Sequence, residues 1–278
     1  MLIRIAAFAA LLFISTSLQA AEPVPLSDFA RHMQFKDVQI SPDGAYLAAT
    51  SIIDGKTVLS FIDLANSTGL TVRPRDDDEV YRFWWVSDKR VVYSVAQNAS
   101  MLESPELTGE LFAANRDGSG TDTLFGYRAS DSRSGSTGTH IQKKEKEYAR
   151  AWMLDDLRDD ENEALIKVER MNRTHVRVAG GERLHPEVRR INVKTGINRS
   201  IAVSPLTNGY FVTDNNGAVR FASGQDDQQR TKVYYRKDND ADWELVVDEL
   251  DNKNISVPIR FNRAGDGAYF TCAGSKNR

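Results

Sequence analysis

Cysteine and histidine are the residues that most often bind transition metals or serve as nucleophile and base, and this chain has few of them. It contains one cysteine and four histidines, none at a helical ligand spacing from another: Cys272, His32, His140, His175 and His185. A single cysteine cannot form an intramolecular disulfide, and it excludes a cysteine-rich zinc site. The spacing of these residues predicts no catalytic, cofactor or metal site.

Acidic side chains gather in four short clusters, which offer the oxygen ligands that Ca²⁺ prefers. The clusters lie at residues 76–79, 155–156, 159–161 and 238–240. None has the Asp-x-Asp-x-Asp-Gly pattern with a distant Glu that marks a calcium-binding loop. We interpret them as solvated loop tips, with Ca²⁺ binding as the alternative.

Arginine and tryptophan are also placed where they could bind a ligand. The arginines on predicted strands are Arg170, Arg173, Arg177, Arg183, Arg189 and Arg190. They could line a channel and steer anionic peptide termini, but the commoner outcome is that such charges face outward and protect strand edges. We predict that the tryptophans at positions 84, 85, 152 and 243 fill the space between sheets rather than form a carbohydrate platform.

Composition narrows the classes of partner. The chain has 278 residues, of which 41% are hydrophobic and 27% charged, as in a folded protein rather than a disordered one. Its 36 basic and 39 acidic residues leave a formal net charge of −3. A weakly acidic chain has no overall electrostatic attraction for DNA or RNA, so we expect no nucleic-acid partner.

The first 21 residues have the order of an export signal. Arg4 precedes an apolar run over residues 5–14, and small and polar residues follow. This order predicts a secretory signal peptide over residues 1–21, cleaved after Ala20 or Ala21. An uncleaved membrane anchor is the alternative, but the apolar run is short for crossing a bilayer. We expect an exported chain, periplasmic or secreted, with no membrane contact after cleavage.

Beyond a lead-in over residues 22–35, with one helical turn predicted over residues 26–31, the chain consists of short strands between Gly-containing turns. A strand, a tight turn and a second strand recur along the chain, and the first and last copies share Asp-Gly-Ala-Tyr. The copies lie at residues 40–48, 84–93, 152–166, 211–221 and 261–271, the middle one being the weakest. Another predicted strand pair follows each copy except the last, so the unit has four strands.

A four-stranded repeat of about 40–50 residues is typical of a β-propeller blade. The predicted turn aspartates Asp43, Asp88, Asp214 and Asp266 fit this spacing if residues 126–150 form an insertion. We therefore predict an all-β fold over residues 36–278, an incomplete β-propeller with about four complete blades and part of a fifth. Because such a propeller leaves strand edges unpaired, we also expect self-association through the unfinished edge.

The repeats resemble the N-terminal propeller of the prolyl oligopeptidase (S9) family of serine peptidases, especially exported bacterial acyl-aminoacyl and dipeptidyl peptidase-like members. The matching residues are 40–48 (Ile-Ser-Pro-Asp-Gly-Ala-Tyr-Leu-Ala), 85–93 (Trp-x-x-Asp-x-Arg-Val-Val-Tyr), 110–118 (Glu-Leu-Phe-x-x-Asn-x-Asp-Gly) and 214–220 (Asp-x-x-Gly-x-Val-Arg). Ser-Pro-Asp-Gly also occurs in TolB-like periplasmic propellers, but the order of all four pieces favours the peptidase family.

This resemblance implies a propeller that gates the access of peptides to an α/β-hydrolase domain with a Gly-x-Ser-x-Gly elbow, an Asp and a His. No serine of this chain has glycine both two positions before and two positions after it. No catalytic residue is therefore transferred, and we predict that this chain is truncated and inactive alone, with peptides bound through the missing hydrolase domain. The alternative is a stand-alone TolB-like propeller for protein–protein contact.

Overall fold

The computed structural model describes residues 35–75, 77–97, 105–127, 147–171, 185–252 and 254–274. Every described residue belongs to one compact unit, residues 35–278. The predicted signal peptide and the helical turn predicted over residues 26–31 lie outside the described residues.

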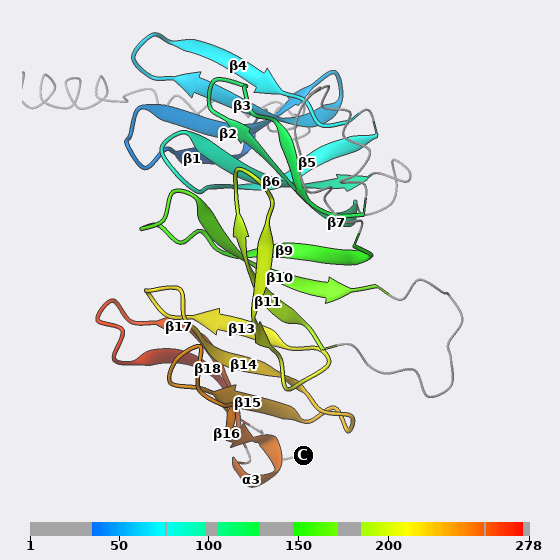
Figure 1. The fold of residues 1–278 in the computed structure, drawn as a ribbon, viewed down its shortest axis with the longest axis vertical. Coiled ribbons are helices and arrows are strands. Elements are labelled where there is room, and N and C mark those ends of the chain that lie inside the picture. The colour runs from blue at the N-terminus through cyan, green and yellow to red at the C-terminus, as the bar shows by residue number, and fades with distance from the viewer. Residues whose placement is uncertain are drawn as a thin grey trace, which may run out of the picture. The chain divides into compact units, whose positions relative to one another are not determined.

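Four four-stranded antiparallel sheets follow one another along the chain, and in each the strands pair in chain order (Figure 1). Sheet A contains β1 (Phe35–Ile40), β2 (Tyr46–Ile53), β3 (Lys56–Asp63) and β4 (Thr68–Val72). Sheet B contains β5 (Asp78–Trp85), β6 (Arg90–Gln97), β7 (Glu106–Asn115) and β8 (Asp122–Phe125). Sheet C contains β9 (Ala149–Asp155), β10 (Glu163–Arg170), β11 (Glu187–Asn192) and β12 (Asn198–Val203). Sheet D contains β13 (Tyr210–Thr213), β14 (Val219–Gln225), β15 (Thr231–Tyr235) and β16 (Glu244–Asp248).

A short helix, α3 (Glu249–Asn252), leads from sheet D to the two-stranded sheet E, which contains β17 (Asn254–Phe261) and β18 (Ala268–Gly274). Within the described ranges, no helix combines the length and the apolar character that crossing a membrane requires. Since β9 and β10 flank the turn of the weakest predicted repeat, that prediction is confirmed.

Apolar cores lie between successive sheets because the strands present buried side chains on both faces. In β7, Phe112 belongs to the core between sheets A and B, while its neighbours Leu111 and Ala113 belong to the core between sheets B and C. A third core joins sheets C and D through residues such as Leu165 and Phe211. Successive side chains of a strand point to opposite faces, so a strand buried on both sides reads as a continuous apolar run.

The contact between sheets D and E is aromatic. The ring centroid of Phe221 lies 5.6 Å from that of Phe261 and 5.6 Å from that of Phe270. Four-stranded antiparallel sheets that pack face to face in chain order are the blades of a β-propeller. The predicted fold class, with four four-stranded blades and one of two strands among the described residues, is confirmed.

The turns between the first and second strands explain why the repeat is recognisable. In sheets A, D and E this turn has a glycine in the left-handed region whose amide donates to the carbonyl three residues earlier: Gly44 (φ 72°) to Ser41, Gly217 (φ 75°) to Asp214 and Gly265 (φ 77°) to Asn262. Glycine reaches this region without the steric penalty of a Cβ atom.

Asp266 lies in the turn between β17 and β18, as the repeat predicts, but the register of this turn differs from that of sheet A. The shared Asp-Gly-Ala-Tyr aligns Asp43-Gly44 with Asp266-Gly267, but the left-handed turn glycine of sheet E is Gly265. Asn262 takes the first turn position there, and its Oδ1 accepts a hydrogen bond from the Gly265 amide at 2.8 Å. The register of the two strands is set by the hydrogen bonds of the turn and not by the shared residue types.

Candidate functional site

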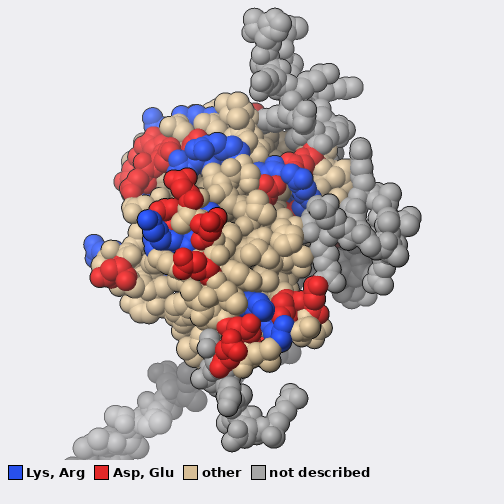
Figure 2. Space-filling view, turned by 60° about the horizontal axis from the view of Figure 1, so that its bottom comes forward, with Lys and Arg blue, Asp and Glu red and all other residues tan. Residues whose placement is uncertain are grey.

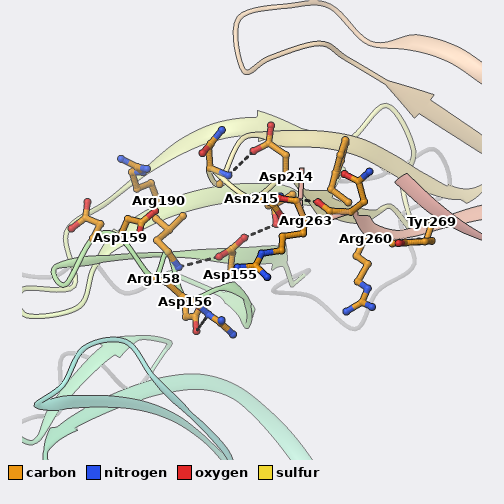
Figure 3. Close-up of a pocket in the computed structure, with 17 residues that line it drawn as sticks. Asp155, Asp156, Arg158, Asp159, Arg190, Asp214, Asn215, Arg260, Arg263 and Tyr269 are labelled. Carbon is orange, nitrogen blue, oxygen red and sulfur yellow. Dashed lines mark hydrogen bonds and ion pairs between the residues drawn. The ribbon is translucent and has the colours of Figure 1, made fainter. Parts of the chain in front are cut away.

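The first turns of sheets C, D and E line a pocket of about 830 Å³ (Figure 3). Its walls come from the ends of β9, β13 and β17 and the turns that follow them, at residues 155–160, 213–217 and 260–263. Arg190 and Tyr269 complete the lining. We call this site the charged pocket, because five aspartates and four arginines contribute to it.

Three hydrogen bonds between sheets, from two side chains, hold the turns in place. Thr213 Oγ1 donates to Asp155 Oδ2 at 2.5 Å, which ties sheet D to sheet C. Asn215 Nδ2 donates to the Asn262 carbonyl at 2.8 Å and to the Arg263 carbonyl at 3.1 Å, which ties sheet D to sheet E. Both donors are short side chains on the β13–β14 segment, so this turn sets the spacing of the other two.

Close packing beneath the pocket requires a glycine at position 217. A Cβ atom there would lie 2.2 Å from Leu157 Cδ2, and the backbone φ of Gly217 is already in the left-handed region at 75°. Asp214 supports the same turn, since its Oδ1 accepts hydrogen bonds at 3.0 Å from the amides of Asn216 and Ala218. Sequence and backbone geometry therefore agree on a rigid turn at the centre of the site.

Some acidic residues of the charged pocket have hydrogen-bond or ionic partners, and Asp159 has none among the described residues. Asp155 and Asp214 are engaged by Thr213 and by Arg220 Nη1, which lies 2.8 Å from Asp214 Oδ2. Burial raises the pKa of the Asp156 carboxyl above its ordinary value, and the nearby Arg158, with Nε 3.7 Å from Asp156 Oδ2, opposes that rise. Within the described part of the chain, the exposed carboxylate of Asp159 has no ionic or hydrogen-bond partner.

The arginines divide in the same way. Arg190 Nη1 lies 3.2 Å from Glu163 Oε2. The Arg260 guanidinium lies over the ring of Tyr269, 5.7 Å from its centroid, and Arg263 contributes its backbone carbonyl to the Asn215 bridge. Neither Arg260 nor Arg263 has an acidic partner among the residues that the structure describes. The pocket therefore presents free charges of both signs, Asp159 against Arg260 and Arg263.

The polar side chains of the charged pocket are mainly carboxylates, guanidiniums and amides. The residues that line the charged pocket include no Ser, Cys, His or Lys. Across the described ranges, no group of three or more His, Cys, Asp or Glu side chains is arranged to hold a metal ion. The charged pocket is open, and its guanidinium and carboxylate groups can bind opposite charges of one ligand.

The acidic clusters noted in the sequence have different fates. Residues 155–156 and 159–160 line the charged pocket, and Glu161 lies just beyond it. In the cluster at 76–79 the solvated-tip interpretation is wrong for Asp78, which is buried on β5 and accepts a hydrogen bond from Gln97 Nε2 at 2.9 Å, while Asp76 lies outside the described residues. The cluster at 238–240 caps its own turn, with Asp238 Oδ1 accepting from the amides of Asp240 and Ala241. The solvated-tip interpretation therefore fits the last cluster, whereas residues 155–160 belong to the candidate site.

The predicted arginine strands contribute mainly structure. Arg189 is buried and pairs with Glu147 and Glu187, at 2.5 Å to each. Arg170 also approaches Glu147 and Glu187, at 3.6 Å and 3.5 Å. Arg173, Arg177 and Arg183 lie outside the described residues. Of the predicted strand arginines that the structure describes, Arg190 alone lines the charged pocket.

The tryptophans are also mostly structural. Trp85 packs in the core of sheets A and B, and Trp152 and Trp243 lie beneath Lys167 and Arg236, at 4.7 Å and 4.6 Å from their ring centroids. The space-filling prediction is thus confirmed for Trp85. Arg260 and Arg263 went unnoticed in the sequence, where only their position at the first turn of a repeat could have pointed to them.

The face shown in Figure 2 carries Lys and Arg side chains next to Asp and Glu side chains, without a continuous patch of one sign. Long-range attraction for a polyanion or a polycation needs such a patch. The face in Figure 2 therefore offers no such long-range attraction.

No protein-family model matches the chain, and no curated protein gives a match. Among solved structures, acylaminoacyl peptidase from Pyrococcus horikoshii is similar at 12% identity and a TM-score of 0.47, over 87% of this chain and 36% of that one. The β-propeller domain of the trilobed protease from Pyrococcus furiosus is similar at 10% identity and a TM-score of 0.46, over 87% of this chain and 66% of that one. A nidogen/laminin complex is similar at 12% identity and a TM-score of 0.40, over 85% and 71%.

Likenesses of this size concern the fold alone. The assignment to the propeller class rests on the sheet order of the chain itself. This chain spans about a third of the acylaminoacyl peptidase, so the activity of that whole enzyme is not carried over with the fold.

Proposed function

We propose that this chain is the peptide-binding propeller of an exported serine peptidase of the prolyl oligopeptidase type, whose hydrolytic residues lie on a separate α/β-hydrolase domain. The observation that carries the proposal is the presence of free carboxylate and guanidinium groups in one pocket, from Asp159, Arg260 and Arg263. The order of the sequence pieces that resemble the S9 propeller supports the same function.

A short peptide has the chemistry that this pocket would recognise. Its terminal carboxylate suits the guanidiniums of Arg260 and Arg263, and its terminal ammonium suits the carboxylate of Asp159. Both charges in one small ligand distinguish a free peptide from a loop of a folded protein, whose chain has no ends nearby. Selection of free peptide ends is therefore the gating role that we assign to the propeller.

Export is part of the same proposal, based on the signal-like order of residues 1–21. An exported peptidase would meet peptides released from other proteins outside the cytoplasm. The mature N-terminus of the chain from a periplasmic or culture fraction, read by N-terminal sequencing, would begin after Ala20 or Ala21.

The function is tested by calorimetric titration of the chain with a length series of unmodified alanine peptides. We expect saturable binding of peptides with free ends, weakened about tenfold when the ends are acetylated and amidated. Arg263→Gln and Asp159→Asn should each weaken binding of the free peptide. The matched controls Arg73→Gln and Asp54→Asn, exposed residues of sheet A, should leave binding unchanged.

Two results would contradict the proposal. Equal binding of free and capped peptides would show that terminal charges are not recognised. Covalent labelling of a serine in this chain by a fluorophosphonate probe, together with cleavage of peptide p-nitroanilides, would show that the chain carries its own hydrolytic site.

A further inference from the structure

A second pocket of about 490 Å³ lies at the first turns of sheets A, B and C. Its lining consists of Gln39, Ile40, Ser41, Pro42, Trp84, Trp85, Val86, Ser87, Asp88, Asp156, Arg158 and Glu161. We call it the tryptophan pocket. Its volume lies within the range of pockets that bind small ligands or single side chains.

The apolar wall of the tryptophan pocket follows from strand alternation. Trp85 points into the core of sheets A and B, where its ring centroid lies 5.8 Å from that of Phe61. Its neighbour Trp84 therefore points to the opposite face of β5, and it is only half-buried. Ile40 stands beside it with 58% of its surface exposed, although it is aliphatic. An aromatic face and an aliphatic side chain are thus open to a ligand.

The same pocket carries an excess of carboxylates. In the part of the chain that the structure describes, the Glu161 side chain has no ionic or hydrogen-bond partner. The Asp88 carboxylate makes no hydrogen bond, and the cation near it is Arg116, which donates to the Asp88 backbone carbonyl at 3.0 Å and lies outside the pocket lining. Asp156 has one, Arg158, whose side chain is 89% exposed. Three carboxylates and one guanidinium leave the tryptophan pocket negative, whereas the neighbouring charged pocket ends in the unpaired Arg260 and Arg263.

Asp156 and Arg158 line both pockets. Figure 3 shows the two residues at the end of the charged pocket opposite Arg260 and Tyr269. A ligand that reaches this end of the charged pocket is therefore already at the entrance of the tryptophan pocket. The two pockets therefore form neighbouring subsites, one with free charges of both signs and one with an excess of carboxylates.

From this arrangement we propose that the tryptophan pocket binds the side chain of a lysine or arginine in the peptide held by the charged pocket. The inference rests on the proposed function, because it takes a peptide as the shared ligand. Asp88, Glu161 and Trp84 are then specificity-determining residues of the propeller.

A long basic side chain matches both parts of the lining. Its aliphatic stem covers apolar surface while its cationic head stays near carboxylates, and a cation is also attracted to the face of an indole ring. A neutral aliphatic side chain would take water away from Asp88 and Glu161 without replacing their hydrogen bonds, which is unfavourable. An acidic side chain would be repelled by both.

The test uses small ligands that report on the tryptophan pocket alone. Calorimetric titration should show that Nα-acetyl-lysinamide binds about tenfold more tightly than Nα-acetyl-norleucinamide, which has a stem of similar length without the charge. The double variant Asp88→Asn, Glu161→Gln should lose this preference, and Trp84→Leu should weaken binding of the lysine ligand. Asp54→Asn, an exposed carboxylate of sheet A, is the control that should preserve the preference.

An unchanged melting temperature identifies the variants that fold. The substitutions of Asp88 and Glu161 are at surface positions, so the double variant should fold. It tests the inference even if Trp84→Leu does not fold. Equal affinity for the lysine and norleucine ligands would overturn the inference, as would a preference that persists in the double variant. Binding of alanine peptides without any lysine preference would refute the tryptophan pocket alone. Binding of the lysine ligand without recognition of peptide ends would instead refute the proposed function.

Discussion

The interface between sheets B and C and the interface between sheets D and E are built differently. Between B and C, side chains such as Leu111 and Ile166 have no exposed surface and contact apolar neighbours on both sheets. Between D and E, the contact is a small group of phenylalanine rings, and Phe270 remains 37% exposed. The first interface is a closed core, and the second is partly open.

The hydrogen bonds across the two interfaces also differ in how deeply their donors are buried. Arg90 of sheet B is buried, and its Nε donates to the Val193 carbonyl, at the end of β11 in sheet C, at 2.6 Å. Burial lowers the pKa of Arg90, because the charged form loses water. The link between D and E is the exposed amide of Asn215.

The difference between the two interfaces indicates which part of the propeller can open more easily. The charged pocket is lined by turns of sheets C, D and E, next to the more open interface. Regions with fewer buried apolar contacts open at lower free energy, and binding sites are commonly placed on such segments over a rigid scaffold. Sheets B and C serve as that scaffold.

The largest effect is expected in the B–C core. Ile166→Ala should lower the free energy of unfolding by about 3 kcal/mol, because it leaves a cavity in a fully buried site. Phe270→Ala, although it removes more atoms, should lower it by only about 1 kcal/mol, since the ring is partly exposed already. Urea denaturation measures both. Equal losses would show that the two interfaces are equally closed.

Arg90→Ala should lower the free energy of unfolding by about 2 kcal/mol, because the Val193 and Gly120 carbonyls would lose their donor in a buried place. Arg90→Lys should recover little, since an ammonium group cannot reproduce the planar guanidinium fork. Arg73→Ala, an exposed arginine, is the control. A stable Arg90→Lys protein would show that charge alone, without the fork, suffices at this interface.

Two turn aspartates should respond to pH in opposite ways. Hydrogen bonds from Ser41 and Arg116 lower the pKa of Asp43 from 3.8 to about 2, whereas burial raises that of Asp156. The carboxylate of Asp43 therefore stabilises the fold above pH 3.8, and this contribution disappears as the pH falls toward 2. Ionised Asp156 opposes folding at neutral pH, and protonation removes that penalty as the pH falls through its raised pKa.

Asp43→Asn should thus lower the free energy of unfolding at neutral pH by about 1 kcal/mol, because the pair with Arg116 is partly screened by water. Asp156→Asn should raise it. Thermal unfolding between neutral pH and about pH 2 measures both trends, and each variant should lose the pH dependence that its own carboxylate supplies. If both substitutions lower the free energy of unfolding at neutral pH, the ionised carboxylate of Asp156 stabilises the fold despite its burial, and the expectation for Asp156 is wrong.

Asn215→Ala should have the smallest effect on stability and a larger one on binding. Its amide is exposed, so the loss of two hydrogen bonds should change the free energy of unfolding by about 0.5 kcal/mol. Arg263, however, is positioned through its carbonyl by this amide, so affinity for free-ended peptides should fall several-fold. Calorimetry and urea denaturation on the same preparation separate the two effects.

The strand pairs, the four-stranded unit and the all-β class could be predicted from sequence, because apolar alternation and Gly-containing turns are local properties. Even the weakly patterned stretch at residues 152–166 was identified correctly by its alignment with the other copies. Asp266 lies in the turn between β17 and β18, as predicted, but identical residues in two turns do not force identical hydrogen bonds. The register depended on Asn262 and Gly265 instead.

The sequence by itself determined the kind of unit that repeats, since strand periodicity and turn glycines act within a few residues of the chain. Tertiary structure decided which charges remain without partners. Arg90, Arg189, Arg260 and Arg263 are the same residue type, yet packing buries the first two and leaves the other two free beside a pocket. Burial and pairing depend on segments far apart in the chain, so the candidate site became visible only when the sheets were assembled.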